Sequence, residues 1–333
     1  LRSRIQRLQR KKSHLAALYQ ALYDAQSEHV IELCEQEIAA EGRYQHFCKR
    51  VMAENLLALK RYEEVENLLN DSLNQRRSGW ALLLLAKTYF EQERYEESLN
   101  LCNEAIDGNR YFAEAYDILA QTYRATGNIE QAFTSILAAA DIAPYNMPRQ
   151  YLVMEIAKDV NDVPQQVQAS KQLYEITRRS LKQDITHLLN YIRTIIDAAL
   201  HSQEPVQRNK YSQEVSLALQ RVQRDEVMTR EIDFGLFEAL CQARLESLNG
   251  AQYQAKKTFA AVADKLSEQH HVVPDAIFLL NQIGEFEQAQ TLRQLLPADI
   301  AANPVLSGLL RDQQYYIDKK QRKFSEINKA GIN

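Results

Sequence analysis

The chain has 333 residues, only 9 glycines and 7 prolines, and a formal net charge of -4 at pH 7. Its abundant Leu, Ala, Glu, Gln, Lys and Arg favour helices and leave little room for strands. A slightly acidic chain of this kind is not a general nucleic-acid binder. No apolar run is long enough to span a bilayer, no signal peptide is recognisable, and the four cysteines form no CxxC pair. We therefore expect a cytoplasmic protein without a membrane partner.

Residues 1–12, LRSRIQRLQRKK, carry six basic side chains and no acidic one. Leu1, Ile5 and Leu8 recur at helical spacing, so this stretch is predicted to be a basic linker helix. Binding of nucleic acid or another anionic surface by this helix is a less favoured alternative, because basic runs are usually solvated. The chain starts at Leu1 rather than Met, so we expect it to be part of a longer protein.

Residues 13–180 are predicted to form tetratricopeptide repeats. A degenerate helical hairpin at 13–41 and a clearer one at 44–73 precede two copies of one 34-residue unit within 78–144. The five repeated packing positions are Ala86, Tyr89, Ser98, Cys102 and Ala105 in the first copy, and Ala120, Tyr123, Ala132, Ile136 and Ala139 in the second. A further copy follows at 149–178. Because one hairpin cannot bury its apolar face alone, the spacing predicts an all-α, tetratricopeptide-like right-handed solenoid of antiparallel helix pairs.

Residues 181–333 are predicted to be degenerate helical repeats with a C-terminal capping helix. Residues 184–201 read as a long amphipathic helix, and the polar stretch 202–209 reads as a loop. The 34-residue spacing returns between 250–255 and 284–289. A polar helix at 312–329 would close the array, and its apolar side chains leave a homodimer open as an alternative.

Signals of catalysis are missing from the sequence. It contains no glycine-rich phosphate loop, no HExxH and no nucleophile elbow, and its one histidine pair, His270 and His271, reads as a solvated loop. We therefore expect no catalytic residue, no cofactor and no metal site, and the chain is predicted not to be an enzyme.

A solenoid of this type offers a concave groove lined by the first helix of each hairpin. Phasing from Ala53, Ala86 and Ala120 predicts that a protein partner contacts Arg50, Glu54, Trp80, Leu83, Lys87, Phe90, Asp117, Gln121 and Arg124. Trp80 is the only tryptophan, and Trp is enriched in binding hot spots, although packing between adjacent hairpins is the somewhat favoured explanation of it. The lysines and asparagines with which tetratricopeptide co-chaperones hold a C-terminal carboxylate are absent, since Glu54, Leu84 and Glu114 stand in that region.

Several runs between residues 1 and 181 resemble a narrower family. They are the linker helix followed by HLAALYQAL, the run NQRRSGWALLLLAKTYFEQERYEES, and the segments AEAYDILAQTY and APYNMPRQ. The most distinctive element is Arg76 with Trp80 and Ala81. Together these runs resemble the C-terminal output region of bacterial response regulators that join a receiver domain to tetratricopeptide repeats.

The resemblance implies that a histidine kinase phosphorylates a receiver upstream of Leu1, and that the repeats grip or release a protein partner in response. The leading hypothesis is therefore a non-enzymatic interaction module that serves as the output of a two-component system. A stand-alone scaffold or assembly factor, using the same groove without phosphosignalling, is the alternative.

Overall fold

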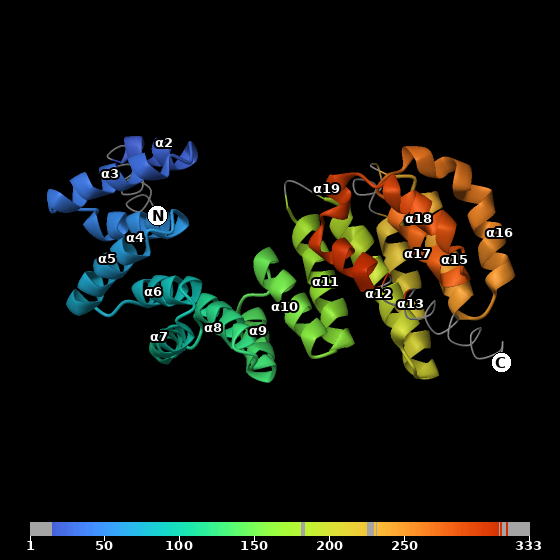
Figure 1. Cartoon of the computed structure of the whole chain (residues 1–333), viewed down its shortest axis with the longest axis horizontal. Coiled ribbons are helices and arrows are strands. Elements are labelled where there is room, and N and C mark those ends of the chain that lie inside the picture. Colours follow the sequence, from blue (N-terminus) through green and yellow to red (C-terminus); the bar gives the residue numbers. More distant parts are fainter. Residues whose placement is uncertain are drawn as a thin grey trace, which may run out of the picture. The chain divides into compact units, whose positions relative to one another are not determined.

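The computed structural model describes residues 15–180, 184–224, 230, 232–312, 314 and 318. Every regular element in these ranges is a helix (Figure 1). This confirms the predicted all-α fold. The expected linker helix at 1–12 and most of the expected capping helix at 312–329, including its apolar side chains, lie outside the described residues.

The chain divides into two compact units, Leu1–Pro144 and Tyr145–Asn333. The sequence-based boundary at residue 180 marks a different property, the point where the repeat pattern weakens, and it stays a prediction.

The described part of the first unit is a stack of helix pairs. They are α2 (Ala16–Tyr23) with α3 (Ser27–Ala39), α4 (Gln45–Ala58) with α5 (Tyr62–Gln75), α6 (Gly79–Glu91) with α7 (Tyr95–Gly108), and α8 (Ala113–Ala125) with α9 (Ile129–Ile142).

Each pair turns on one residue in the left-handed backbone conformation. In the first unit these residues are Ala25, Lys60, Glu93 and Gly127, with φ between 52° and 79°. The turn closes by two hydrogen bonds of the Schellman type: in α6, Glu93 N donates to Phe90 O at 3.0 Å and Arg94 N to Tyr89 O at 2.8 Å. The turn residue therefore fixes both the end of one helix and the start of the next.

Glu93 and Gly127 occupy the same position in successive turns, so they make a matched test of this geometry. A side chain in the left-handed region costs roughly 1–2 kcal/mol, part of which the greater flexibility of glycine in the unfolded chain offsets. We expect Glu93→Gly to stabilise the first unit by about 0.5–1 kcal/mol, and Gly127→Ala to destabilise it by about 1 kcal/mol. Urea unfolding followed by tryptophan fluorescence measures both changes. Destabilisation by Glu93→Gly, or stabilisation by Gly127→Ala, would contradict the account.

The second helix of each pair buries a residue five positions after the turn residue. Val30, Val65, Ser98 and Ala132 occupy this position in the first unit and are fully buried, as are Ala86, Ala120 and Ala139. Short side chains at these places let the paired helices approach closely. Burial of Ser98 does not leave its hydroxyl unpaired, because Ser98 Oγ donates a hydrogen bond to Ala86 O at 2.9 Å.

The second unit continues the pairing. Its helices are α10 (Met147–Asp159), α11 (Val163–Arg178), α12 (Ile185–His201), α13 (Pro205–Gln223), α15 (Phe234–Leu248), α16 (Gln252–Val262), α17 (Val273–Ile283), α18 (Phe286–Gln294) and α19 (Ala298–Ala301), with a 3-10 helix at Ala263–Glu268. The α-helices range from 4 residues in α19 to 19 residues in α13. Left-handed turn residues recur at Asn161, Gly250 and Gly284.

The predicted loop at 202–209 is wrong in its second half, because α13 begins at Pro205. Proline suits the first position of a helix, where its fixed φ is already helical and its missing N–H is not needed. The composition of the stretch concealed this helix start.

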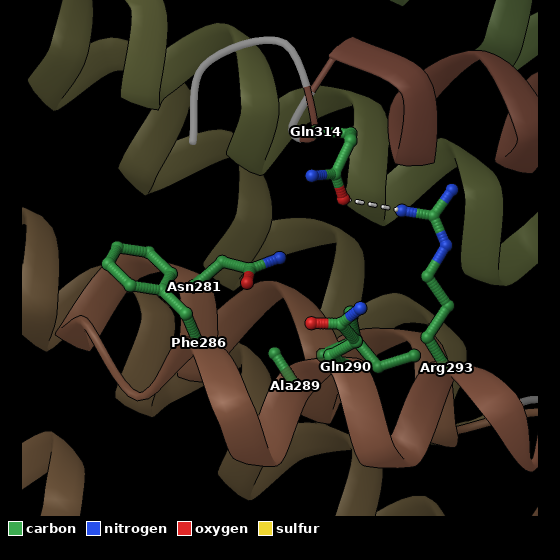
Figure 2. Close-up of a pocket in the computed structure, with 7 residues that line it drawn as sticks. Asn281, Phe286, Ala289, Gln290, Arg293 and Gln314 are labelled. Carbon is green, nitrogen blue, oxygen red and sulfur yellow. Dashed lines mark hydrogen bonds between the residues drawn. The ribbon is translucent and has the colours of Figure 1, made fainter. Parts of the chain in front are cut away.

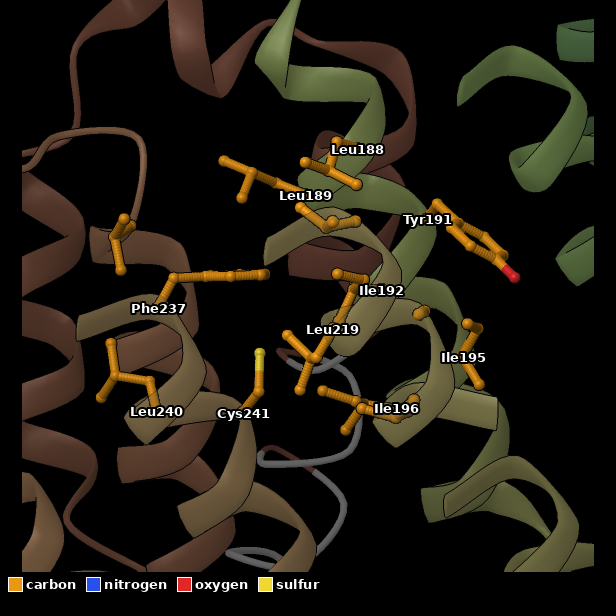
Figure 3. Close-up of a cluster of buried hydrophobic side chains, with 14 of the residues drawn as sticks. Leu188, Leu189, Tyr191, Ile192, Ile195, Ile196, Leu219, Phe237, Leu240 and Cys241 are labelled. Carbon is orange, nitrogen blue, oxygen red and sulfur yellow. The ribbon is translucent and has the colours of Figure 1, made fainter. Parts of the chain in front are cut away.

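Helix α12 is the centre of the core of the second unit (Figure 3). Leu188, Ile192 and Ile196 of α12 are fully buried and share one cluster with Leu219 of α13 and Phe237 of α15. The amphipathic pattern of 184–201 predicted this helix, although the structure buries nearly its whole circumference.

Three charged side chains lie inside this unit, in what we call the buried ion cluster: Arg193 of α12, Arg244 of α15 and Asp275 of α17. Each is at most 1% exposed. Arg193 donates from Nε to both carboxylate oxygens of Asp275 at 3.1 Å and from Nη2 to Asp275 Oδ2 at 2.6 Å. Arg244 Nη1 lies 3.7 Å from Asp275 Oδ1. One carboxylate thus ties three helices together.

Candidate protein-binding face

Helices α4, α6 and α8 are the first helices of successive pairs, and each contacts the next. Counting back from the turn residues Lys60, Glu93 and Gly127 places the predicted groove residues in shared rows. The row ten positions before the turn is Arg50, Leu83 and Asp117, the row six positions before is Glu54, Lys87 and Gln121, and the row three positions before contains Phe90 and Arg124. Trp80 lies one turn before Leu83 on α6. We call these nine residues the first-helix face.

Helix α6 gives this face its apolar part. Trp80 and Leu83 are half-buried and pack against the core cluster that α5 and α6 share. The Phe90 ring lies 6.0 Å from the Tyr95 ring, tilted by 56°. Lys87 is exposed between them. The helix therefore presents a strip of apolar side chains, each held from below by the core, and interrupted by one cation.

The neighbouring helices contribute polar groups. Arg50 Nε donates to Glu54 Oε1 at 2.9 Å, and because both side chains are exposed the ion pair adds little to stability. On α8, Gln121 donates through its side-chain amide to Asp117 O at 3.2 Å. Asp117 and Arg124 are half-buried. The strip on α6 is thus flanked on both sides by polar side chains.

Sequence reasoning missed a pair of arginines at the turn edge of the same unit. Arg94 Nη1 lies 3.1 Å from Glu66 Oε2 of the preceding pair, and Arg94 Cζ lies 3.9 Å from the centroid of the Tyr89 ring. Arg61 likewise reaches the preceding pair, where its Nη1 lies 2.9 Å from Glu28 Oε2. Both arginines follow a left-handed turn residue and open the motif Arg-Tyr-Glu-Glu, which occurs twice in the sequence. That repeated motif was the available signal that adjacent pairs are linked here.

A pocket of about 540 Å³ lies in the second unit, over α17 and α18 (Figure 2). Among the described residues that line it, Arg293 alone is ionisable, and Arg293 Nη1 donates to Gln314 Oε1 at 3.0 Å. The lining residues are Ile277, Asn281, Phe286, Ala289, Gln290, Arg293 and Gln314. Nothing in this set supplies a nucleophile or a general base.

In the described ranges, no three His, Cys, Asp or Glu side chains lie close enough together to hold a metal ion. Of the predicted histidine pair, His271 contributes its backbone carbonyl, which accepts a hydrogen bond from Arg193 Nη2 at 2.6 Å. Among the helices described, none combines the length and the hydropathy needed to cross a bilayer.

Comparison with known proteins gives likenesses of fold. No protein-family model matches the sequence, and no curated protein matches it. A structure of Naa15/Naa10 bound to HypK-THB is 14% identical with a TM-score of 0.50, covering 83% of this chain and 42% of that one. PilF of Pseudomonas aeruginosa is 12% identical with a TM-score of 0.46, covering 68% and 97%. A tetratricopeptide repeat protein from Parabacteroides merdae is 13% identical with a TM-score of 0.36, covering 79% and 96%. The chain is an all-α stack of tetratricopeptide-like helix pairs.

Proposed function

We propose that the chain is a non-enzymatic scaffold that binds another protein on the first-helix face. The observation that carries the proposal is the strip on α6, where Trp80, Leu83 and Phe90 are half-buried beside exposed Lys87. Large apolar side chains that the core already holds in place lose little conformational freedom on binding, and they form the centre of most protein interfaces. The polar side chains of α4 and α8 would form the rim.

We further propose that this scaffold is the output region of a two-component response regulator, with a stand-alone scaffold as the alternative. The support is the resemblance of the runs in residues 1–181, and the proposal needs a receiver encoded upstream of Leu1. The linker at 1–12, outside the described residues, would carry the signal. Deleting it from the full-length protein should uncouple partner binding from receiver phosphorylation. Unchanged coupling would remove the linker's role, and a reading frame without a receiver would favour the alternative.

Charge reversal on the strip tests the binding face. Lys87→Glu is expected to weaken binding of a partner isolated by affinity capture by at least about tenfold, because it places a carboxylate at the centre of the face. Lys87 is exposed, so the helical circular dichroism spectrum should not change. The matched control is Lys257→Glu, which reverses an exposed lysine on α16 of the second unit.

Trp80→Ala separates the two explanations of Trp80. Loss of binding with an unchanged helical spectrum would assign it to the interface, and unfolding of the variant would assign it to packing. Equal affinity of wild type, Lys87→Glu and Lys257→Glu would contradict the proposed face.

A further inference from the structure

Two cysteines meet at the contact between the first two described helix pairs. Cys34 of α3 and Cys48 of α4 are both fully buried and belong to one apolar cluster. Burial raises the pKa of Cys34 to about 12, and a hydrogen bond and charge interaction with the Cys48 thiol contribute to the shift. Helix α3 packs against α4, so the two side chains are neighbours within this cluster.

In the following pairs, the positions equivalent to Cys34 and Cys48 do not hold two cysteines. Cys34 lies nine residues after its turn residue, as Leu69 and Cys102 do, and Cys48 lies twelve residues before the next one, as Ala81 and Ala115 do. All of these side chains are fully buried. The slot is thus filled by Leu with Ala and by Cys with Ala elsewhere, so packing alone does not call for two thiols in contact.

In the packed state these thiols are protected. A thiol is reactive as its thiolate, and burial holds the Cys34 proton in place at neutral pH. Repeat proteins open locally at the contacts between neighbouring units. When α3 separates from α4, both sulfurs reach solvent and regain ordinary acidity. The pair then becomes reactive together, whereas Cys102 and Cys241 are each buried in other clusters.

We propose that Cys34 and Cys48 form a redox modification site that converts to an intramolecular disulfide with a small oxidised thiol such as glutathione disulfide. One cysteine thiolate attacks glutathione disulfide, which gives a protein–glutathione mixed disulfide and releases one glutathione. The second cysteine thiolate attacks the protein sulfur of that mixed disulfide and releases the other glutathione. Two protein thiols are oxidised by two electrons, and glutathione disulfide is reduced to two glutathione molecules that carry the two protons.

The product would join α3 to α4, the helix that carries Arg50 and Glu54 of the first-helix face. Closing a short loop between residues 34 and 48 removes freedom from the open state and not from the packed one. Oxidation would therefore hold the first described pair against the second, and reduction would release it.

Intact mass and peptide mapping of the full chain, incubated with excess glutathione disulfide at pH 8, test the site. The expected product is a single Cys34–Cys48 cross-link, with Cys102 and Cys241 still reduced as controls within the same molecule. Hydrogen exchange of amides in α3 should slow by on the order of 100-fold after oxidation. Cys34→Ala should instead stop at the mixed disulfide on Cys48, and Cys102→Ala should cross-link as wild type does.

Three results would overturn the proposal: no Cys34–Cys48 cross-link in wild type, modification of all four cysteines at similar rates, or faster exchange of α3 after oxidation. The mapping of wild type needs no variant to fold, so a poorly folded Cys34→Ala protein does not weaken the test.

Discussion

Asp275→Ala is expected to lower the free energy of unfolding of the second unit by about 3–5 kcal/mol. The carboxylate is fully buried and faces two arginines that are each 1% exposed. Its removal leaves Arg193 and Arg244 buried without an anion in the cluster. Burial lowers the pKa of Arg244, and the negative charge of Asp275 acts in the opposite direction. Without Asp275, the charged form of the Arg244 guanidinium would therefore be less favourable. Urea unfolding followed by far-ultraviolet circular dichroism measures the loss.

The control for this variant is Asp264→Ala, which removes an exposed carboxylate from the 3-10 helix of the same unit. Its effect should stay within about 0.5 kcal/mol, as surface substitutions usually do. A loss below about 1 kcal/mol for Asp275→Ala would mean that water or a rearranged side chain reaches the arginines, and the described packing of the cluster would then be wrong.

Removing all three charges together gives the complementary expectation. Replacing Arg193 and Arg244 by methionine and Asp275 by leucine is expected to recover most of the stability that Asp275→Ala loses, because no ion is left to desolvate. The hydrogen bonds of Arg193 to Asn190 and of Arg244 to Gln282, at 3.1 and 3.0 Å, would also be lost, so recovery should be incomplete. A triple variant less stable than Asp275→Ala would show that the hydrogen bonds to Asn190 and Gln282 contribute more to stability than removal of the buried charges recovers.

The buried ion cluster also shows what the sequence could not reveal. Arg193 and Asp275 are 82 residues apart, and each sits in a helix whose apolar pattern is complete without it. Their pairing depends on how α12, α15 and α17 pack, which no local spacing encodes. Helical hairpins are different, because the turn, the small packing residues and the period all lie within one repeat. That is why the pairs around Glu93 and Gly127 could be predicted with their packing residues.

The alignment of the first-helix face rests on the same local rule, and its role as a binding site stays a proposal. Counting from Ala53, Ala86 and Ala120 was enough to align eight of the nine residues in shared rows, since equal repeats put equal positions side by side, and Trp80 stands outside these rows. Exposure was not predictable in this way. How much of Trp80 the core covers depends on the cluster that several helices build together, and the ion pair of Arg94 with Glu66 depends on the stacking of two pairs.

Leu69→Ala is the second variant with a large expected effect, in the first unit. Leu69 of α5 is fully buried in the cluster that also contains Ala81 and Leu85 of α6. Truncating a buried leucine removes its transfer free energy and leaves a cavity, so we expect a loss of about 3 kcal/mol. The matched control is Leu59→Ala, at a leucine 38% exposed in the same unit, which should lose less than about 1 kcal/mol.

Trp80 makes this prediction measurable in one unit alone, because it is the only tryptophan and lies in the first unit. Its fluorescence follows the pair α6–α7, whereas circular dichroism follows both units. In a repeat stack, the stability is the sum of the intrinsic stability of each pair and of the contacts between neighbouring pairs. A cavity in α5 therefore also weakens the packing of α5 against α6. The Trp80 transition should therefore shift to lower urea by nearly the full loss. If circular dichroism shifts and Trp80 fluorescence does not, α5 and α6 unfold separately, and the shared core cluster does not couple them.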